Sequence, residues 1–229
     1  MVKNDEITKK FTKKIQEYTE MTVYGQTVHC PYWMNKIKDG QVRIRGFSNG
    51  KGSASEIRQE LIKQIDKLSI DREHLTSEYI RKLAKRNRIG IDCSGFVYRI
   101  LNALYTSLDR IFSGGITKTD VKRLTSKEFC IPIQKVEDIQ PGDLIRLRGG
   151  KHVVIILEKT ADTVVYAHSS NLTTKIKGVH LAKIKITNPS KPIEFQHWLE
   201  KTGKNENFGK KFFHTDKGDG IFRLNIFVK

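Results

Sequence analysis

The 229-residue sequence predicts an α+β fold. Over the first half of the chain, apolar residues recur at the three- and four-residue spacing of amphipathic helices. From residue 143 onward they alternate with polar residues or form short continuous runs, as strands do. Helices followed by a series of strands are typical of a protein whose antiparallel sheet packs against its helices. No internal repeat and no clear linker divides the chain.

Four helices are expected in the first half. Ser53 and Glu56 fit a capping box, which predicts a helix start, and Gly90 ends the third helix. The helices cover residues 5–20, the stretch from 53 to 68, residues 75–88, and residues 93–104. Their buried positions are predicted to be Ile7, Phe11, Ile15 and Tyr18; Ile57, Leu61, Ile65 and Leu68; Tyr79, Ile80 and Leu83; and Phe96, Val97, Ile100, Leu101 and Leu104.

The second half predicts the sheet. Pro141 and Gly142 form a turn before the first strand. Strands are expected over residues 143–148, 152–157, 163–168, 179–186 and 221–228, and a shorter one over 41–47. Residues 196–201 are expected to form a short helix. The polar, glycine-bearing stretch 203–220 is expected to be a mobile loop.

The chain is strongly basic, with a formal net charge of +17. Because Lys and Arg are spread over its whole length, the charge indicates either a solvated basic surface or attraction to an anionic polymer. The sequence has neither zinc-finger spacing nor an RNA-recognition signature, which argues against nucleic acid and leaves an anionic cell envelope. No apolar run approaches the ~20 residues of a membrane span, and the N-terminus lacks an apolar signal-peptide segment.

Cys93 differs from the other two cysteines through its neighbours. An odd number of widely spaced cysteines implies no disulfide framework, and Cys30 and Cys130 are expected to be small buried residues. Asp92, Cys93, Ser94 and Gly95 instead open an amphipathic helix. The positive end of a helix favours a thiolate, and a thiolate is the nucleophile of cysteine hydrolases. The backbone N–H of Cys93 or Ser94 is expected to stabilise an oxyanion.

His152 is the expected general base. It begins a continuous apolar strand, so its backbone is held rigidly while its ring lies at the strand end. His168 ends the next strand, and in an antiparallel hairpin the start of one strand neighbours the end of the next. His168 is therefore expected to orient His152. The remaining histidines have no ligand spacing, so no metal or cofactor is expected and structural or exposed roles are favoured: His29, His74, His180, His197 and His214.

Four sequence blocks in one order resemble the NlpC-type cell-wall peptidases. They are Asp-Cys-Ser-Gly-Phe-Val at 92–97, Pro-Gly-Asp-Leu at 141–144, His-Val-Val-Ile-Ile-Leu at 152–157 and Tyr-Ala-His-Ser-Ser at 166–170. The resemblance covers about residues 89–170. It implies a papain-like cysteine peptidase fold with Cys93 as nucleophile, His152 as base and acid, and His168 as orienting residue. It also implies cleavage of peptidoglycan stem peptides between D-glutamate and a diamino acid.

The resemblance places Asp92 and an upstream tyrosine beside the free amino end of the substrate, with Ser94 next to them. Tyr32 lies in Cys30-Pro31-Tyr32-Trp33, which resembles the Pro-Tyr-x-Trp-like segment of the family but stands 61 residues before Cys93. Either the two intervening helices are an insertion over the cleft, or Tyr32 is a packing residue. Where the family often has glycine, this chain has Val154, which is expected to narrow the space next to His152.

The expected organisation is an N-terminal helical extension, residues 1–88, packed on a catalytic domain, residues 89–229. The expected partner is a peptidoglycan peptide or another anionic wall polymer. Without a signal peptide, the protein is expected to be cytoplasmic, exported by another route, or trimmed of its leader, whereas the resemblance implies the cell envelope or the exterior. Two other functions remain open: a related thiol hydrolase or transferase acting on a lipid or protein acyl group, and a basic binding module without turnover.

Overall fold

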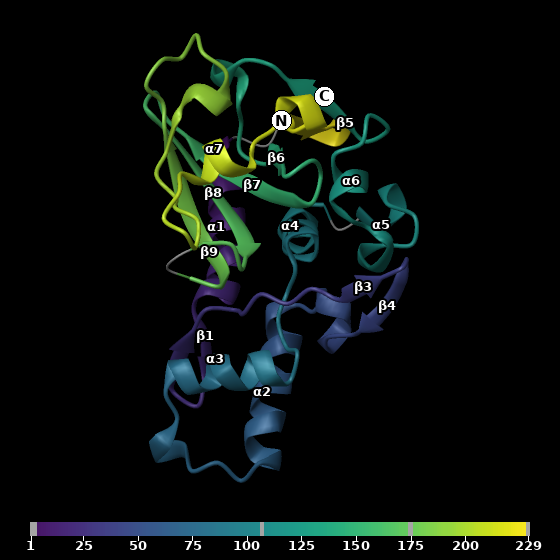
Figure 1. Cartoon of the computed structure of the whole chain (residues 1–229), viewed down its shortest axis with the longest axis vertical. Helices are drawn as coiled ribbons and strands as arrows, with labels where there is room; N and C mark the ends of the chain where they lie inside the picture. Colours follow the sequence, from purple (N-terminus) through teal and green to yellow (C-terminus); the bar gives the residue numbers. More distant parts are fainter. Residues whose placement is uncertain (1–3, 106–107, 174–175, 228–229) are drawn as a thin grey trace.

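A seven-stranded sheet and the helices that cover it make this an α+β protein (Figure 1). The computed structural model describes residues 4–105, 108–173 and 176–227. The strand order is β10-β9-β8-β7-β6-β11-β5, and every neighbouring pair is antiparallel. The strands are β5 (Cys130–Ile133), β6 (Leu144–Leu147), β7 (His152–Lys159), β8 (Thr163–Ser170), β9 (Gly178–Lys185), β10 (His197–Trp198) and β11 (Gly220–Leu224).

Both faces of the central strand β7 are buried. Val153 and Ile155 belong to one core cluster, whereas Val154 and Ile156 belong to a second cluster on the opposite face. This is why the sequence of β7 is continuously apolar. Helices α1 (Asn4–Thr19) and α4 (Cys93–Asn102) pack on the first face. The second face is covered by segments near the C-terminal end, including Trp198.

The N-terminal region contributes two further helices and two hairpins. Helix α2 (Ala54–Lys67) begins with the predicted capping box, and α3 (Ser77–Arg86) follows it. The hairpins are β1 (Met21–Val23) with β2 (Gln26–Val28), and β3 (Lys36–Lys38) with β4 (Gln41–Ile44). In Figure 1, α2 and α3 lie below the sheet, and α4 lies between them and the strands.

One hydrophobic core joins residues on either side of position 88. Phe11, Tyr18 and Ile57 belong to the same cluster as Phe96 and Val153. The rings of Tyr18 and Phe96 meet edge to face with centroids 5.5 Å apart. The N-terminal helices are therefore part of the packing that holds α4 against the sheet.

Short elements complete the chain. The remaining α-helices are α5 (Leu108–Ile111), α6 (Val121–Leu124) and α7 (Phe208–Phe212). The 3-10 turns are η1 (Phe47–Gly50), η2 (Arg72–His74), η3 (Ile116–Lys118), η4 (Val136–Asp138), η5 (Ile193–Phe195), η6 (Thr215–Lys217) and η7 (Asn225–Phe227).

The second half departs from the sequence prediction in several places. Residues 196–201 form β10 and irregular chain rather than a helix, because Trp198 is fully buried and pairs with β9. The stretch 203–220, expected to be a mobile loop, contains α7, whose Phe208 is fully buried. Strand β5 was not predicted, and β11 ends at Leu224; Val228 lies outside the described residues. In α3, Tyr79 is exposed rather than directed inward.

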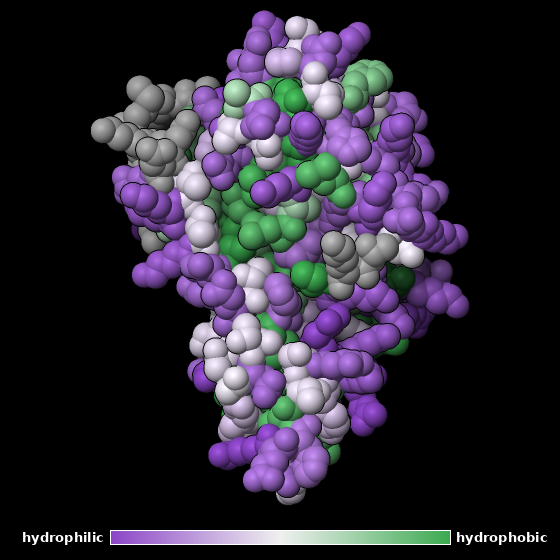
Figure 2. Space-filling view, turned by 90° about the vertical axis from the view of Figure 1, so that its left-hand side faces the viewer, coloured by the Kyte–Doolittle hydropathy of each residue, from purple (hydrophilic) through white to green (hydrophobic). Residues whose placement is uncertain are grey.

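The surface is predominantly hydrophilic. Figure 2 shows this on the side that faces left in Figure 1, with an apolar area in its upper half. Leu181 on β9 and Phe195 and Leu199 around β10 are exposed hydrophobic residues. Within the described residues, no helix combines the length and the apolar character needed to cross a bilayer.

Candidate active site

Cys93 is the first residue of α4. Asp92 caps the helix, since its carboxylate accepts a hydrogen bond of 2.6 Å from the backbone N–H of Gly95. Gly95 is needed at this position because a Cβ atom there would stand 2.7 Å from Cδ of Lys51 and 3.0 Å from the Gly50 carbonyl oxygen. Among the described residues, the backbone N–H of Cys93 has no hydrogen-bond acceptor, so it is available to an oxyanion.

A cleft of about 750 Å³ opens at the start of α4. Five of the six site residues expected from the sequence line it: Tyr32, Asp92, Cys93, Ser94 and His152. The backbone N–H of Val153, next to His152, is among the groups that lower the pKa of the Cys93 thiol, and α4 packs against β7, so the thiol and the start of β7 are neighbours. The two halves of the sequence pattern therefore meet in one cleft.

Tyr32 reaches the cleft although it is distant from Cys93 in sequence. Its segment runs parallel to the chain before α4: Tyr32 pairs with Ile91, and the Ile91 N–H donates to the Pro31 carbonyl oxygen at 3.0 Å. Helices α2 and α3 lie in the chain between the Tyr32 segment and the Ile91 segment. Neither helix contributes a lining residue to this cleft. The half-buried Tyr32 thus packs on the chain and also faces the cleft.

His168 lies directly behind His152. Nε2 of His152 and Nδ1 of His168 are 2.8 Å apart. His168 is fully buried and does not line the cleft, so its hydrogen-bond link to the cleft passes through His152. Since Nε2 of His152 is engaged in this pair, Nδ1 is the ring nitrogen that remains for the Cys93 thiol.

Glu200 and His180 extend this chain of imidazole rings. Nε2 of His168 lies 3.0 Å from Oε1 of Glu200, and Nε2 of His180 lies 2.7 Å from the same oxygen. The hydroxyl of Tyr166 donates to the other carboxylate oxygen. Contacts with the two histidines hold the pKa of Glu200 below its usual range although the carboxyl is largely buried.

The carboxylate determines which nitrogen carries each proton. An ionised Glu200 only accepts, so Nε2 of His168 donates to it and Nδ1 of His168 becomes an acceptor. His152 must then donate from Nε2, which leaves a lone pair on its Nδ1. Nδ1 of His180 lies 2.9 Å from the Gly178 carbonyl oxygen, and its Nε2 lies 2.7 Å from Oε1 of Glu200. The arrangement prepares His152 to act as a base.

Burial opposes ionisation of the Cys93 thiol. Burial, with a contribution from the Asp92 carboxylate, raises the pKa of Cys93 to about 12. Burial and the neighbouring His168 lower the pKa of His152 well below its usual value. Burial of Cys93 therefore opposes the thiolate that a helix start favours. A neutral thiol beside a neutral imidazole calls for proton transfer during attack rather than before it.

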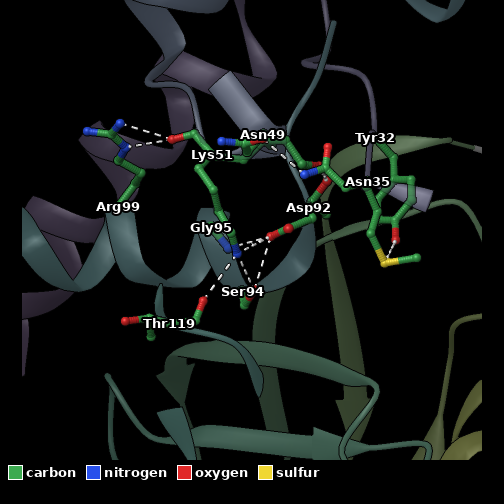
Figure 3. A network of polar contacts seen from close by, with 12 residues as sticks. Tyr32, Asn35, Asn49, Lys51, Asp92, Ser94, Gly95, Arg99 and Thr119 are labelled. Carbon is green, nitrogen blue, oxygen red and sulfur yellow. Dashed lines mark hydrogen bonds and ion pairs between the residues drawn. The ribbon is translucent and has the colours of Figure 1, made fainter. Parts of the chain in front are cut away.

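Asp92 is paired with a buried lysine. Nζ of Lys51 lies 2.9 Å from Oδ1 of Asp92 and 2.5 Å from the Ser94 hydroxyl oxygen, and it also donates to the Thr119 carbonyl oxygen at 3.3 Å (Figure 3). Arg99 of α4 holds the Lys51 carbonyl oxygen through two hydrogen bonds of 2.9 and 3.1 Å. The carboxylate that the sequence resemblance assigns to a substrate amine already has a cationic partner.

One cluster contains the donor types of a metal site. Nitrogen atoms of His168 and His180 and a carboxylate oxygen of Glu200 lie within 4.8 Å of one another. Their separations of 2.7 to 3.0 Å are those of hydrogen bonds. Ligands around a tetrahedral zinc ion stand about 3.3 Å apart, so an ion would have to push them outward. The observed geometry suits a proton relay better than a metal.

Three residues of the site were not expected from the sequence. His180 was assigned a structural or exposed role, although the β8–β9 register places it directly opposite His168. Glu200 follows β10 in a stretch predicted to be helical, and Lys51 lies in a glycine-rich loop; neither carries a sequence signal. Val154 does not narrow the cleft, because its side chain is buried in the second core cluster.

Protein-family models, curated proteins and solved structures were compared with this chain, and none of the three comparisons gives a match.

Proposed function

We propose that this chain is a papain-like cysteine endopeptidase that hydrolyses amide bonds in peptidoglycan stem peptides, at a γ-D-glutamyl–diamino acid linkage. The observation that carries the proposal is the meeting of Cys93 and His152 in one cleft, with His168 hydrogen-bonded behind His152. A thiol at a helix start, a base and an orienting group are the parts that nucleophilic acyl transfer requires. The sequence blocks that resemble NlpC-type peptidases indicate the substrate.

In the first half-reaction, Cys93 attacks the amide carbonyl carbon while its proton moves to Nδ1 of His152. The negative charge that develops on the carbonyl oxygen is stabilised by the backbone N–H of Cys93. Collapse of the tetrahedral intermediate breaks the C–N bond. His152 then donates its proton to the departing amine, and a thioester remains on Cys93.

In the second half-reaction, His152 takes a proton from water, and the hydroxide formed attacks the thioester. Collapse of this intermediate breaks the C–S bond, releases the carboxylic acid and restores the Cys93 thiol. The positive charge on His152 in each step is compensated through His168 by the Glu200 carboxylate. No metal or cofactor takes part in this sequence of steps.

The test is hydrolysis of a defined stem tetrapeptide followed by mass spectrometry of the products. The wild-type chain should release the dipeptide that ends in D-glutamate, and Cys93→Ala should release none. Cys130→Ala is the matched control, because Cys130 is also buried but lies on β5 away from the cleft. Product formation by Cys93→Ala at the wild-type rate would reject Cys93 as the nucleophile.

A further inference from the structure

The cleft at Cys93 is lined predominantly by cations. Its charged lining residues are Arg45, Lys51, Lys118, Lys122, Arg148 and Lys151, against Asp92 and Asp120. Asp92 is paired with Lys51, and Asp120 caps helix α6 through the backbone N–H of Arg123. Within the described part of the chain, Lys118, Lys122, Arg148 and Lys151 form no ion pair. These cations can therefore pair with an anionic ligand.

The basic lining continues into a second pocket. This pocket, about 690 Å³, shares Tyr32, Met34 and Asn171 with the first. It is lined by five further cations and one acidic residue, namely Lys36, Arg81, Lys82, Lys85, Lys177 and Glu78. The two pockets adjoin at Tyr32, and Cys93 lines the first of them, so together they are called the basic groove.

Lys51 makes the groove unfavourable for a substrate ammonium group. Its ammonium group donates to the Asp92 carboxylate, the Ser94 hydroxyl and the Thr119 carbonyl oxygen, so its three protons all have acceptors. Both side chains of the Lys51–Asp92 pair are 11% exposed. A substrate ammonium would have to displace Lys51 from this buried pair, or lie beside a cation of the same sign.

We propose that the groove selects peptides that carry free carboxylates around the scissile amide and whose amino end is acylated. This inference rests on the proposed function, since it names the substrates of the same thiol. Stem peptides in which the amino end is still joined to another group, and in which the D-glutamate carboxylate is not amidated, meet both conditions. The attraction is electrostatic, so it weakens as salt increases.

The first experiment measures binding rather than turnover. The full-length Cys93→Ala chain is titrated by calorimetry with N-acetyl-L-Ala-γ-D-Glu-L-Lys-D-Ala, with the same peptide bearing a free amine, and with the acetylated peptide bearing D-isoglutamine. The acetylated acidic peptide should bind about fivefold or more tightly than either of the others, because each of them changes one charge in the groove. Equal affinities, or tighter binding of the free amine, would overturn the proposal, as would failure of all three to bind.

Variants locate the effect. Lys151→Glu and Lys122→Glu should each weaken binding of the acetylated acidic peptide about tenfold at low salt. Lys67→Glu makes the same charge change on the exposed end of α2, outside both pockets, and should change affinity less than about twofold. Equal losses in all three variants would show a general effect of net charge and would contradict a specific groove.

Lys51→Met tests the role of the buried pair. Removing the ammonium leaves Asp92 without its cation. The ratio of the affinities for the acetylated acidic peptide and its free-amine form should therefore shift about fivefold or more toward the free amine. A ratio of two affinities measured on one sample does not depend on how much of the variant is folded. An unchanged ratio would remove Lys51 from the selection of the amino end.

Turnover by the wild-type chain decides the proposed function separately. If the groove binds the acetylated acidic peptide preferentially but no peptide is cleaved, the proposed peptidase function is wrong and the inferred ligand preference is retained. If peptides are cleaved with no preference among the three, the assignment stands and this inference fails.

Discussion

Three imidazole rings and one carboxylate decide which nitrogen of His152 is free to accept a proton. Glu200 sets the positions of the protons on His168 and His152, since an ionised carboxylate only accepts hydrogen bonds. The proton positions then pass through His168 to His152 over contacts of 3.0 and 2.8 Å. At the residue scale, the reactivity of the thiol therefore depends on groups that do not line the cleft.

Glu200→Gln should lower kcat about 10- to 100-fold with little change in KM, because an amide no longer fixes the tautomer of His168. Tyr166→Phe is the matched control: it removes one donor to the same carboxylate and leaves both histidine contacts in place, so its effect should be smaller. Steady-state kinetics over a range of pH separates the two variants. A Glu200→Gln variant with unchanged kcat and pH profile would exclude a positioning role.

The pKa shifts predict a distinctive pH dependence. The pKa of His152 is lowered, so its neutral, basic form persists below pH 6.5, and the acid limb of kcat/KM should lie at lower pH than for an ordinary histidine. If kcat/KM instead falls at or above pH 6.5 as the pH is lowered, burial does not lower the pKa of His152.

Alkylation of Cys93 should report the raised pKa directly. Since only the thiolate reacts and the pKa of Cys93 is about 12, the rate with iodoacetamide should rise about tenfold per pH unit above neutrality. Peptide mapping after timed labelling assigns the rate to Cys93. A rate that levels off below pH 8 would indicate a thiolate–imidazolium pair in the resting site.

Helix α4 is the element that joins the cleft to the core. Its first turn carries Asp92 and Cys93, and its apolar face belongs to the core shared with the N-terminal helices. The capping hydrogen bond and the Lys51–Asp92 pair both act on this first turn. The position of the thiol thus depends on local capping and on a loop 41 residues upstream.

Asp92→Ala should lower the free energy of unfolding by about 3 to 5 kcal/mol, because it removes a cap and leaves the buried Lys51 ammonium unpaired. Thr76→Ala is the matched control: Thr76 caps helix α3 through the backbone N–H of Tyr79 and has no ion-pair partner, so its loss should cost about 1 kcal/mol. Chemical denaturation measures both. Adding Lys51→Met to Asp92→Ala should restore part of the lost free energy of unfolding, because the unpaired ammonium is then gone. An equally low free energy of unfolding in the double variant would contradict the energetic coupling of Lys51 and Asp92.

The sequence predicted the elements whose pattern is local. The four main helices, the capping box at Ser53 and strands β6 to β9 follow from periodicity and turn residues, and the pairing of His152 with His168 follows from hairpin geometry. Contacts made across the fold were not predictable. Glu200 reaches His168 only because β10 pairs with β9, and the pKa of Cys93 depends on burial that no spacing reveals.

The whole molecule is organised around one sheet with a core on each face. The first core contains residues from α1 and α2 as well as from α4 and β7, so the region before residue 88 helps to support α4. The same region supplies Tyr32 and Lys51 to the cleft. The N-terminal segment therefore contributes both to the core and to the cleft.

A chain limited to residues 89–229 should not form a stable fold, since it would expose the face of α4 and β7 that Phe11, Ile15 and Tyr18 cover. Circular dichroism during heating should show no cooperative transition for this fragment and a single one for the full chain. A fragment that melts cooperatively and keeps dispersed amide resonances would show that the N-terminal region is dispensable for folding.

The central claim is that Cys93 forms a thioester with the acyl half of its peptide substrate. Rapid acid quenching of the wild-type chain during hydrolysis of the acetylated stem peptide, followed by intact-mass measurement and peptide mapping, tests it most directly. We predict an added mass equal to the acyl fragment on the peptide that contains Cys93, and none in Cys93→Ala. An adduct on Cys30 or Cys130, or steady hydrolysis by Cys93→Ala, would contradict it.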